Sequence, residues 1–270
     1  MAQVENGNVV IFGAGGPLGA AATTALKDHY TLRCTDVVPI EQIVAEQRRQ
    51  SDTAPLPELL EAPHERRVVD VAQYDQVLDA CRGMDAAINL TVVRRHLEKA
   101  FTVNTVGAFN IARAVTENGI KRLIHTGPFH AMLRHNADYF HDYELVDDVP
   151  LHPGDDLYAL TKYLGAQITR VFAERQRLEV LTFLFRAFRS RRIAPEERGR
   201  GVLPFTVSWE DAGESFLHGL RADVMPTPYE VFFICSDTPD RKHRVDKARR
   251  LLGWTARDTW EALYRRVESC

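Results

Sequence analysis

The sequence predicts an α/β protein built on a doubly wound parallel sheet. Up to about residue 186, short apolar runs alternate with longer segments of helical period, a rhythm typical of repeated βαβ units. A glycine-rich turn directly follows the first apolar run, and an aspartate follows the second. Several runs are continuously apolar, as strands covered by helices on both faces must be. The expected strands span residues 8–12, 31–35, 67–70, 86–90, 121–126 and 180–186.

The helices expected between these strands span residues 17–28, 73–81, 95–118 and 155–177. Residues 41–64 interrupt the rhythm with a polar, helix-like stretch and three prolines, so we expect a surface insertion there. After residue 186 follow an arginine-rich loop, a helix around 210–222, a strand at 229–235 and two amphipathic helices. We therefore expect a nucleotide-binding domain of residues 1–186 and a smaller substrate-binding lobe of residues 187–270 on the carboxyl edge of the sheet.

The composition excludes several classes of protein. The chain has 270 residues, of which 45% are hydrophobic and 26% charged, an ordinary globular balance. A formal net charge of -3 gives no basic field for nucleic acid. Four cysteines without a CxxC pair argue against a zinc site or a disulfide framework and favour a reducing compartment. Without a signal pattern or an apolar run of ~18 residues, we expect a cytoplasmic protein with no membrane partner.

The glycine-rich turn lies between an expected strand and an expected helix. Gly13, Gly16 and Gly19 are spaced three residues apart, and Pro17 and Leu18 separate the last two. Glycine permits a tight turn and a close approach of the backbone to a pyrophosphate, and the positive end of the helix favours the phosphate charge. Proline suits the first helical position, where its missing N–H would have no intrahelical partner. The turn therefore predicts a dinucleotide site in a Rossmann-type sheet.

Asp36 follows the second expected strand, about twenty residues after Gly16. A carboxylate at this place accepts hydrogen bonds from the ribose hydroxyls of NAD and repels the extra phosphate of NADP. Arg33 lies upstream within the strand, and Arg48 and Arg49 lie too far along the chain to be the usual readers of that phosphate. An aspartate that only caps a turn would give the same pattern. The cofactor expected from this residue is NAD.

Tyr158 and Lys162 lie four residues apart in an expected helix, so the phenol and the ammonium share one helical face. A neighbouring cation lowers the pKa of a phenol, which prepares Tyr158 to exchange a proton with a hydroxyl or a carbonyl. A YxxxK pattern alone is usually an ordinary helix face. Its place on the helix before the sixth strand of a nucleotide-binding fold makes this pair a candidate catalytic unit.

Together these motifs resemble the extended short-chain dehydrogenase/reductases, the NAD-dependent epimerase/dehydratase group, over nearly the whole chain. The further similar stretches are Asp70-Val71, residues 86–90, residues 103–110, residues 207–212 and residues 251–254. The resemblance implies that Asp70 and Val71 contact adenine and that Asn89 and Leu90, at a strand end, belong to the cofactor site. It also implies that Asn104 shapes the helix beside the active site and that Lys162 holds the nicotinamide ribose. For the two C-terminal stretches, packing is the simpler explanation.

One departure from the family pattern concerns its substrate-polarising serine. Pro128 stands where the resemblance places that serine. Thr126 is the nearest remaining hydroxyl, and His130 could instead donate a hydrogen bond to a substrate oxygen. Thr126 could equally close the strand, and His130 could be a solvated loop residue. The spacings of His125, His130, His135 and His141 match neither a helical pair nor a close strand pair, so we expect no metal site.

Six arginines gather after residue 185, where the family's substrate-facing loops begin: Arg186, Arg189, Arg191, Arg192, Arg198 and Arg200. Guanidinium groups suit a carboxylate or phosphate, so Arg186 and Arg189 are candidate substrate ligands, with a solvated basic loop as the alternative. The helices at 95–118 and 155–177 are long and apolar enough for the paired-helix homodimer contact of the family. Packing within one chain would look the same.

The leading hypothesis is an NAD-dependent enzyme acting at a secondary alcohol or carbonyl of a sugar-like substrate, which the arginine cluster would allow to be anionic. Tyr158 exchanges the proton, the nicotinamide exchanges the hydride, and Lys162 tunes the tyrosine, with Thr126 as a further catalytic candidate. The short C-terminal lobe looks more like the compact uronate dehydrogenases than the large nucleotide-sugar epimerases. The alternative is a non-catalytic sensor or scaffold that binds NAD. The missing serine favours the sensor, and the intact Tyr158 and Lys162 pair favours the enzyme.

Overall fold

The computed structural model describes residues 4–48, 51, 53–129, 144–147, 153 and 156–265. Its strands are β1 Asn8–Phe12, β2 Thr31–Asp36, β3 Glu65–Val68, β4 Ala86–Asn89, β5 Arg122–Pro128, β6 Glu179–Phe185, β7 Ala187–Arg189, β8 Thr206–Ser208 and β9 Tyr229–Phe233. Its α-helices are α1 Pro17–Leu26, α2 Ile40–Ala45, α3 Tyr74–Cys81, α4 Leu97–Phe101, α5 Gly107–Glu117, α6 Leu157–Gln176, α7 Trp209–Arg221, α8 Asp246–Leu252 and α9 Glu261–Tyr264.

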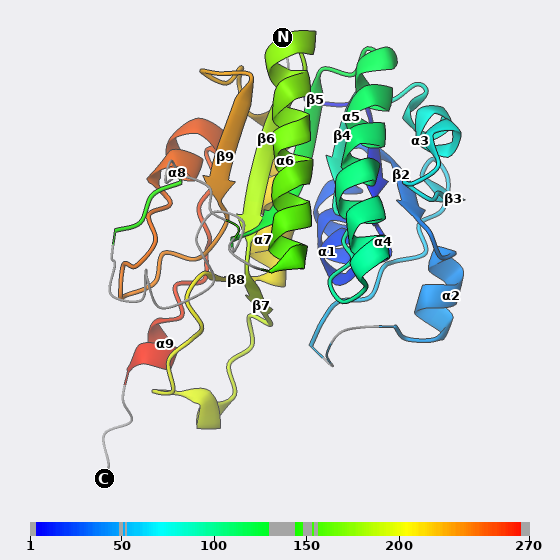
Figure 1. Cartoon of the computed structure of the whole chain (residues 1–270). Helices are drawn as coiled ribbons and strands as arrows, with labels where there is room; N and C mark the ends of the chain where they lie inside the picture. The colour runs from blue at the N-terminus through cyan, green and yellow to red at the C-terminus, as the bar shows by residue number, and fades with distance from the viewer. Residues whose placement is uncertain are drawn as a thin grey trace.

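The main sheet has seven parallel strands in the order β3-β2-β1-β4-β5-β6-β9 (Figure 1). The strand order reverses at β1, which pairs with β2 on one side and with β4 on the other. Ligands of open α/β sheets bind outside the carboxyl ends of the strands at such a reversal. The predicted Rossmann-type, doubly wound sheet is therefore confirmed.

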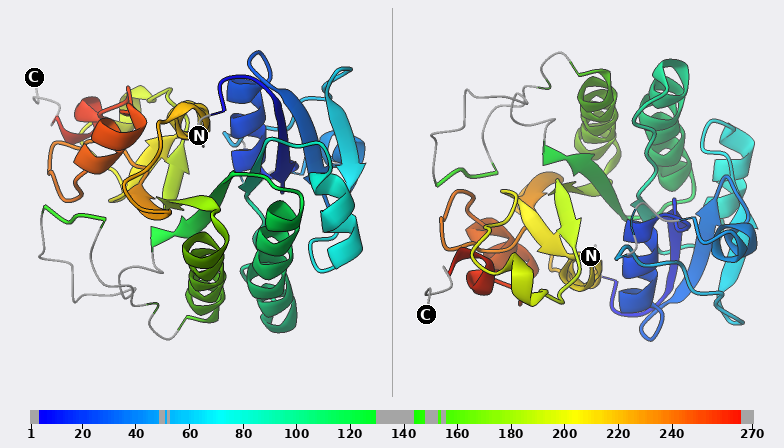
Figure 2. Two further views of the ribbon diagram at one scale, coloured as in Figure 1. Left: turned by 90° about the horizontal axis from the view of Figure 1, so that it is seen from above. Right: turned by 90° about the horizontal axis from the view of Figure 1, so that it is seen from below.

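Helices cover both faces of this sheet (Figure 2). Along β1, Val9 and Ile11 join a core with α1 and α7, whereas Val10 and Phe12 join a second core with α3 and α5. Side chains of a strand alternate between the faces, so a strand buried on both faces needs an uninterrupted apolar run. This burial explains why the first strand was predictable at both of its ends.

The helix expected over residues 95–118 is found as an uninterrupted helical segment over residues 97–117, although its pitch changes within the segment. The segment contains α4, a π-helical turn at Thr102–Val106, and α5. The side chain of Asn104, inside this turn, bonds both backbone groups of Val93, with Val93 N donating to Oδ1 at 2.9 Å and Nδ2 donating to Val93 O at 2.8 Å. π-Helical turns are rare and frequent at functional sites. Hydrophobic periodicity does not reveal such a change of helical pitch.

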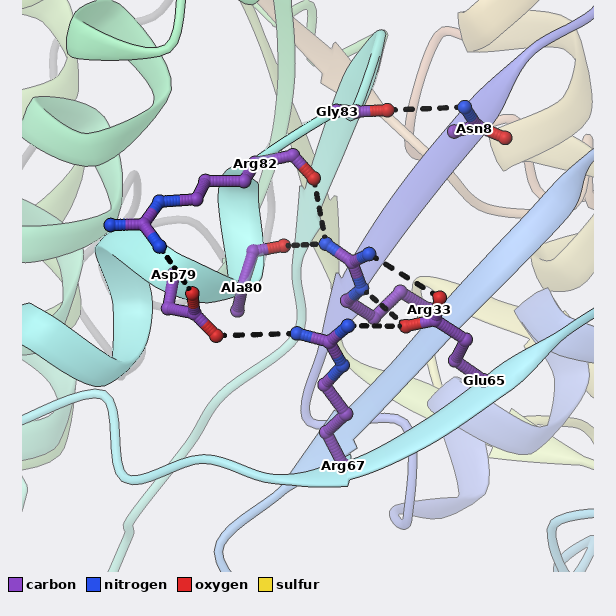
Figure 3. Close-up of polar contacts among 8 residues, drawn as sticks. All are labelled: Asn8, Arg33, Glu65, Arg67, Asp79, Ala80, Arg82 and Gly83. Carbon is purple, nitrogen blue, oxygen red and sulfur yellow. Dashed lines mark hydrogen bonds and ion pairs between the residues drawn. The ribbon is translucent and has the colours of Figure 1, made fainter.

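The strand expected at 67–70 is displaced by two residues, because β3 pairs Glu65 with Arg33 and ends at Val68. Three of the four β3 residues are exposed, so this edge strand lacks the apolar signal of the inner strands. Figure 3 shows how charges fix it instead. The Arg33 guanidinium lies between Glu65 (2.8 Å) and the carbonyl oxygens of Ala80 and Arg82 (2.8 and 2.9 Å). Arg33 therefore has a structural role within the sheet.

The remaining predicted elements are found with their ends moved by a few residues. Residues 41–64 contain α2 and a long irregular segment, and residues 187–208, expected as a loop, contain the small β7-β8 sheet. Strand β9 joins the main sheet beside β6. Cys34, Cys81 and Cys235 are buried free thiols, and Cys270 lies outside the described residues. Over the described part of the chain, no helix is long and apolar enough to cross a membrane.

Candidate active site

The glycine turn closes the carboxyl end of β1. The amides of Gly13 and Ala14 both donate to the carbonyl oxygen of Thr35 at 2.9 Å, which holds the turn against the end of β2. Gly13 has a φ of +86°, and a Cβ on it would lie 3.0 Å from backbone atoms of Leu90 and Thr91. Both its backbone conformation and its close approach to the end of β4 require glycine.

The glycine turn leads directly into α1, and no side chain among the described residues caps the N-terminus of this helix. Gly16 is the N-cap and provides no side-chain cap, and Pro17 occupies the first turn. A Cβ on Gly16 would meet Gly13 O at 3.6 Å, an ordinary contact, so packing within the protein does not require glycine there. Gly16 lines a cavity, together with Leu18 and Gly19. An uncapped helix N-terminus beside free space fits the pyrophosphate of a dinucleotide.

Asp36 lies at the end of β2, directly beside the glycine turn. Its Oδ2 accepts a hydrogen bond from the Gly15 amide at 3.0 Å, and its Oδ1 accepts one from the Val38 amide at 3.3 Å. Burial raises the pKa of this carboxyl, and these amides oppose the rise. A carboxylate with two oxygens retains acceptor capacity beyond these two bonds. The location fits a group that accepts from ribose hydroxyls.

Tyr158 and Lys162 lie on the first turns of α6, as their spacing predicts. The helix begins where Asp156 Oδ1 accepts the Tyr158 amide at 2.8 Å and ends at Arg177, which adopts a left-handed conformation. Burial raises the pKa of the Tyr158 phenol, and the positive charge of Arg94 opposes this rise. Burial, with a further effect of Arg94, lowers the pKa of Lys162 to about 7. The phenol and the amine thus lie in one desolvated environment.

The segment after β4 reaches this pair and is fixed by two asparagines. Asn89 Oδ1 accepts hydrogen bonds from the Thr91 amide at 3.1 Å and from its hydroxyl at 2.7 Å. The carbonyl oxygen of Thr91 then accepts a hydrogen bond from Lys162 Nζ at 3.2 Å. Asn104 fixes Val93 as described above and also donates to Thr161 Oγ1 at 3.0 Å. The Asn89 and Asn104 side chains thereby define the backbone path beside Lys162.

His125 is fully buried on β5 next to Asn89. The Asn89 amide nitrogen and His125 Nδ1 are 3.2 Å apart, and because Asn89 Oδ1 already accepts from Thr91, the amide donates and the imidazole accepts. Burial lowers the pKa of His125 well below its usual value, and the charge of Lys162 contributes to this shift. His125 is therefore neutral and serves as an internal acceptor.

Thr126 lines the cavity, but its hydroxyl donates to the carbonyl oxygen of Asn89 at 2.8 Å. A hydroxyl has one proton to donate. In this geometry the proton is used between β5 and β4, which matches the structural alternative for Thr126 rather than the polarising one. His130, His135 and His141 lie outside the described residues.

A cavity of ≈ 340 Å³ joins the glycine turn to Tyr158 and Lys162. Its lining residues are Gly13, Gly16, Pro17, Leu18, Gly19, Leu90, Val92, Arg94, Thr126, Gly127, Pro128, Tyr158, Lys162, Phe185, Arg186, Phe188 and Trp209. The rings of Phe188 and Trp209 stack 4.5 Å apart with an interplanar angle of 5° and form an aromatic wall. Of the described lining residues, three are basic and none is acidic.

Some predicted residues lie outside this lining. Asp70 and Val71 form the turn after β3, where Asp70 Oδ1 accepts the Ala72 amide and Val71 O accepts Asn110 Nδ2. Arg189 pairs with Glu197 at 2.7 Å, so among the candidate arginines of the 186–200 segment the lining contains Arg186. In the described part of the chain, no group of three or more His, Cys, Asp or Glu residues could hold a metal ion.

Arg94, Phe188 and Trp209 line the cavity and were not predicted. Arg94 is exposed on an irregular segment, and its guanidinium carbon lies 5.6 Å from the centroid of the Tyr158 ring. Sequence pattern offers no signal for it, because its place depends on the asparagine contacts of that segment. Trp209, in contrast, immediately follows Ser208, whose hydroxyl caps α7 by accepting the Asp211 amide at 3.1 Å. A serine followed by tryptophan and two acidic residues is typical of a helix start, so this pattern is a signal by which the place of Trp209 could have been found.

Comparisons with known proteins find a matching family and relatives of low sequence identity. A family model described as the NAD dependent epimerase/dehydratase family matches residues 9–208. Uronate dehydrogenase of Pseudomonas syringae pv. tomato is 23% identical over 212 residues, which cover 77% of this chain and 68% of that protein. NAD-dependent glucose-6-phosphate dehydrogenase of Haloferax volcanii is 24% identical over 261 residues, which cover 93% of each protein.

A solved structure shows the same fold. A variant of uronate dehydrogenase from Agrobacterium tumefaciens, in complex with NAD, superposes with a TM-score of 0.71 at 19% sequence identity. The superposition covers 95% of this chain and 87% of that chain. The doubly wound architecture is therefore shared with a protein whose crystal structure contains NAD.

Proposed function

Because the chain belongs to the NAD dependent epimerase/dehydratase family, we propose that it oxidises a secondary alcohol of an anionic sugar, with Tyr158 as the acid/base. Family membership confirms the coarser expectations of an enzyme of the sugar dehydrogenase and epimerase kind and of NAD as its cofactor. The substrate and the roles of individual residues are our proposal.

One observation carries this proposal: a single cavity contains both the open glycine turn and the Tyr158 and Lys162 pair. A dinucleotide whose pyrophosphate lies at the N-terminus of α1 leaves the other end of the cavity for substrate. The proposed cofactor-binding residues are Gly13, Gly16, Pro17, Leu18, Gly19, Asp36, Asp70, Val71, Asn89, Leu90, Asn104, Tyr158 and Lys162. When bound there, NAD would supply hydride acceptance.

The residues of the chain supply the proton chemistry. Tyr158, as the phenolate, accepts the proton of the substrate hydroxyl at its Oη. Lys162 is fixed by Thr91 O and lies one helical turn from Tyr158. Below its pKa of about 7, its charge favours the phenolate. We assign Thr126 no catalytic role: it lines the cavity, and its hydroxyl proton is donated to the carbonyl oxygen of Asn89.

The charge of the cavity supports an anionic substrate. Arg94, Lys162 and Arg186 line it without an acidic lining residue in the described chain. Arg186 lies at the end of β6 and donates to Pro204 O at 3.2 Å, which leaves other guanidinium N–H groups for a carboxylate or phosphate. The aromatic wall of Phe188 and Trp209 suits the apolar face of a sugar ring. Both relatives described above have names that specify anionic sugars, a uronate and a sugar phosphate.

We also propose that the two parts of the chain bind different ligands and that the chain forms a homodimer. Residues 1–186 would hold NAD, while residues 187–270 would complete the substrate side through Phe188 and Trp209. The chain would form a homodimer through α4, α5 and α6, which carry exposed apolar side chains. Leu97, Phe101 and Phe109 are 70%, 49% and 41% exposed.

The test of the proposed activity follows NADH absorbance with uronates, sugar phosphates and neutral sugars, in unmodified protein and in Tyr158→Phe. We expect turnover of an anionic sugar, and a loss of ~10² to 10⁴ in rate in the variant with NAD affinity unchanged. Retained activity in Tyr158→Phe would overturn the role of the phenol. Turnover of neutral sugars alone would overturn the anionic substrate.

A further inference from the structure

Arg94 brings a third cationic group to the acid/base pair. Its guanidinium carbon lies 5.6 Å from the centroid of the Tyr158 ring, and both residues line the same cavity. Arg94 comes from the segment between β4 and α4, whereas Tyr158 and Lys162 come from α6. The contact therefore joins two elements distant in the sequence.

Hydrogen bonds tie the segment carrying Arg94 to the helical turn carrying Tyr158. Asn104 holds both backbone groups of Val93, the residue before Arg94. The same amide donates to Thr161 Oγ1 at 3.0 Å, and the Thr161 hydroxyl donates to the carbonyl oxygen of Tyr158 at 3.0 Å. A continuous polar path thus sets the position of the Arg94 backbone relative to Tyr158. The Arg94 side chain is exposed, but the backbone that carries it is held in place by these hydrogen bonds.

The titratable or charged groups of the site come from several elements. Asp156 at the N-cap of α6 and Arg94 on the segment after β4 act on the Tyr158 phenol, and Lys162 of α6 and Arg186 at the end of β6 line the same cavity. The charge of Lys162 acts on His125 of β5. His125 is neutral, and Asp156 raises the pKa of Tyr158. Burial lowers the pKa of Lys162 to about 7, so this amine loses its charge as the pH rises into the range where a phenol ionises. A guanidinium remains charged throughout that range.

We propose that Arg94 is a positioning residue for the acid/base step, which supplies the permanent positive charge that stabilises the phenolate of Tyr158. The inference rests on the proposed role of Tyr158 and adds a division of roles between two cations. Lys162 is held by Thr91 inside the site, and Arg94 provides the charge that persists at alkaline pH. The guanidinium carbon lies 5.6 Å from the ring centroid. Two unit charges at about that separation shift an ionisation by roughly half a pH unit in bulk water and by roughly two pH units at the effective dielectric constant of a protein surface.

The experiment compares unmodified protein with Arg94→Gln, Arg94→Lys and the control Arg95→Gln. Arg95 is the next residue of the same exposed segment and does not line the cavity. Each protein is made with and without Tyr158→Phe, and tyrosinate absorbance is titrated with saturating NAD. The difference within each pair isolates the ionisation of the Tyr158 phenol. The pH profile of kcat/KM with an active sugar gives a second readout.

We expect the Tyr158 titration and the alkaline-side gain of activity to move up by roughly half to two pH units in Arg94→Gln. Arg94→Lys keeps a positive charge and should therefore show little of this shift. Arg95→Gln should titrate like the unmodified protein. An unshifted titration in Arg94→Gln, or an equal shift in Arg95→Gln, would overturn the proposal. A higher KM for anionic sugars with an unshifted titration would also overturn it, by making Arg94 a substrate ligand. Since the titration needs no turnover, a protein without sugar activity would overturn the proposed function separately.

Discussion

Lys162 is buried in the candidate active site and donates a hydrogen bond to the carbonyl oxygen of Thr91, which lies 3.2 Å from its Nζ. The carbonyl is aligned because Asn89 accepts both the amide and the hydroxyl of Thr91. The amine is only 3% exposed. One neutral acceptor offsets little of the cost of burying a charge, which is why the pKa of Lys162 falls to about 7.

This pKa predicts a pH-dependent stability of the cofactor-free protein. The unfolded chain holds its lysine proton up to a pKa near 10.4, whereas the folded protein releases it near 7. Between these values the unfolded state binds more protons, so stability rises with pH and is lost as the pH falls towards 7. Relative to Lys162→Met, the unmodified protein should gain up to about 1.4 kcal/mol per pH unit from pH ~7 to ~10. Denaturant unfolding of both proteins checks this, and a constant difference would contradict the buried amine.

A second prediction concerns a buried ion pair distant from the site. Arg122 is fully buried, pairs with Glu179, and donates to the carbonyl oxygens of Gly219, Leu220 and Ala222, which close the C-terminal end of α7. Arg122→Met removes the cation that pairs with the buried Glu179 carboxylate, which keeps the Met225 amide as a donor, and it removes one donor from each of these carbonyl oxygens. We expect a loss of about 3 to 5 kcal/mol in the free energy of unfolding.

The matched control for this pair is Arg170→Met, which removes an exposed ion pair with Glu174 on α6. It should cost little, because exposed pairs are screened by water. Both losses would be measured by denaturant unfolding. Similar losses in the two variants would show that the Arg122 contacts do not govern stability.

The parts of the fold that were predicted from sequence are those whose burial leaves a local pattern. Strand β1 is apolar at every position but the first because each face lies in a core, and Gly13 is required by its own φ. The shared helical face of Tyr158 and Lys162 follows from their spacing, and the place of their helix before the sixth strand makes the pair a candidate catalytic unit. Strand β3 was displaced because its residues are exposed and its register is set by the pairing of Arg33 with Glu65.

The role of Arg94 could not be predicted for a different reason. Its position depends on contacts between Asn104, Val93 and Thr161, which are distant in the sequence and meet through a π-helical turn. The family resemblance implies that Asn104 shapes the helix beside the active site. It does not indicate that the Asn104 side chain bonds Val93 and Thr161. Conversely, Thr126 was a candidate hydroxyl by position, and a contact to Asn89 across the sheet determines where its proton lies.

A third prediction tests the proposed homodimer. Helices α5 and α6 lie side by side on one face of the sheet, and α4 continues this surface (Figure 1). Replacing Leu97 and Phe101 together with glutamate places two charges on the apolar surface, so the dimer should dissociate. Light scattering after size exclusion measures the mass. Val224→Glu changes a side chain that is also exposed (65%) but lies outside these helices, and it should leave the mass unchanged. A monomer in the unmodified protein would contradict the assembly.

The last prediction concerns the choice between NAD and NADP. Asp36 accepts the Gly15 amide at 3.0 Å, so its carboxylate already lies beside the turn that would hold the pyrophosphate. If the carboxylate also accepts from the ribose hydroxyls, removing it loses charge-assisted hydrogen bonds and the repulsion of a 2′-phosphate. Asp36→Ala should weaken NAD binding about tenfold or more and narrow the gap to NADP. Asp36→Asn, which can still accept from Gly15, separates the loss of charge from the loss of the turn contact.

Calorimetric titration of both cofactors measures the affinities, with Asp75→Ala on the exposed side of α3 as the control. Equal affinities for the two cofactors in the unmodified protein would remove Asp36 from the cofactor site, and Arg33 could not take its place because Glu65 and two backbone carbonyls already bind its guanidinium.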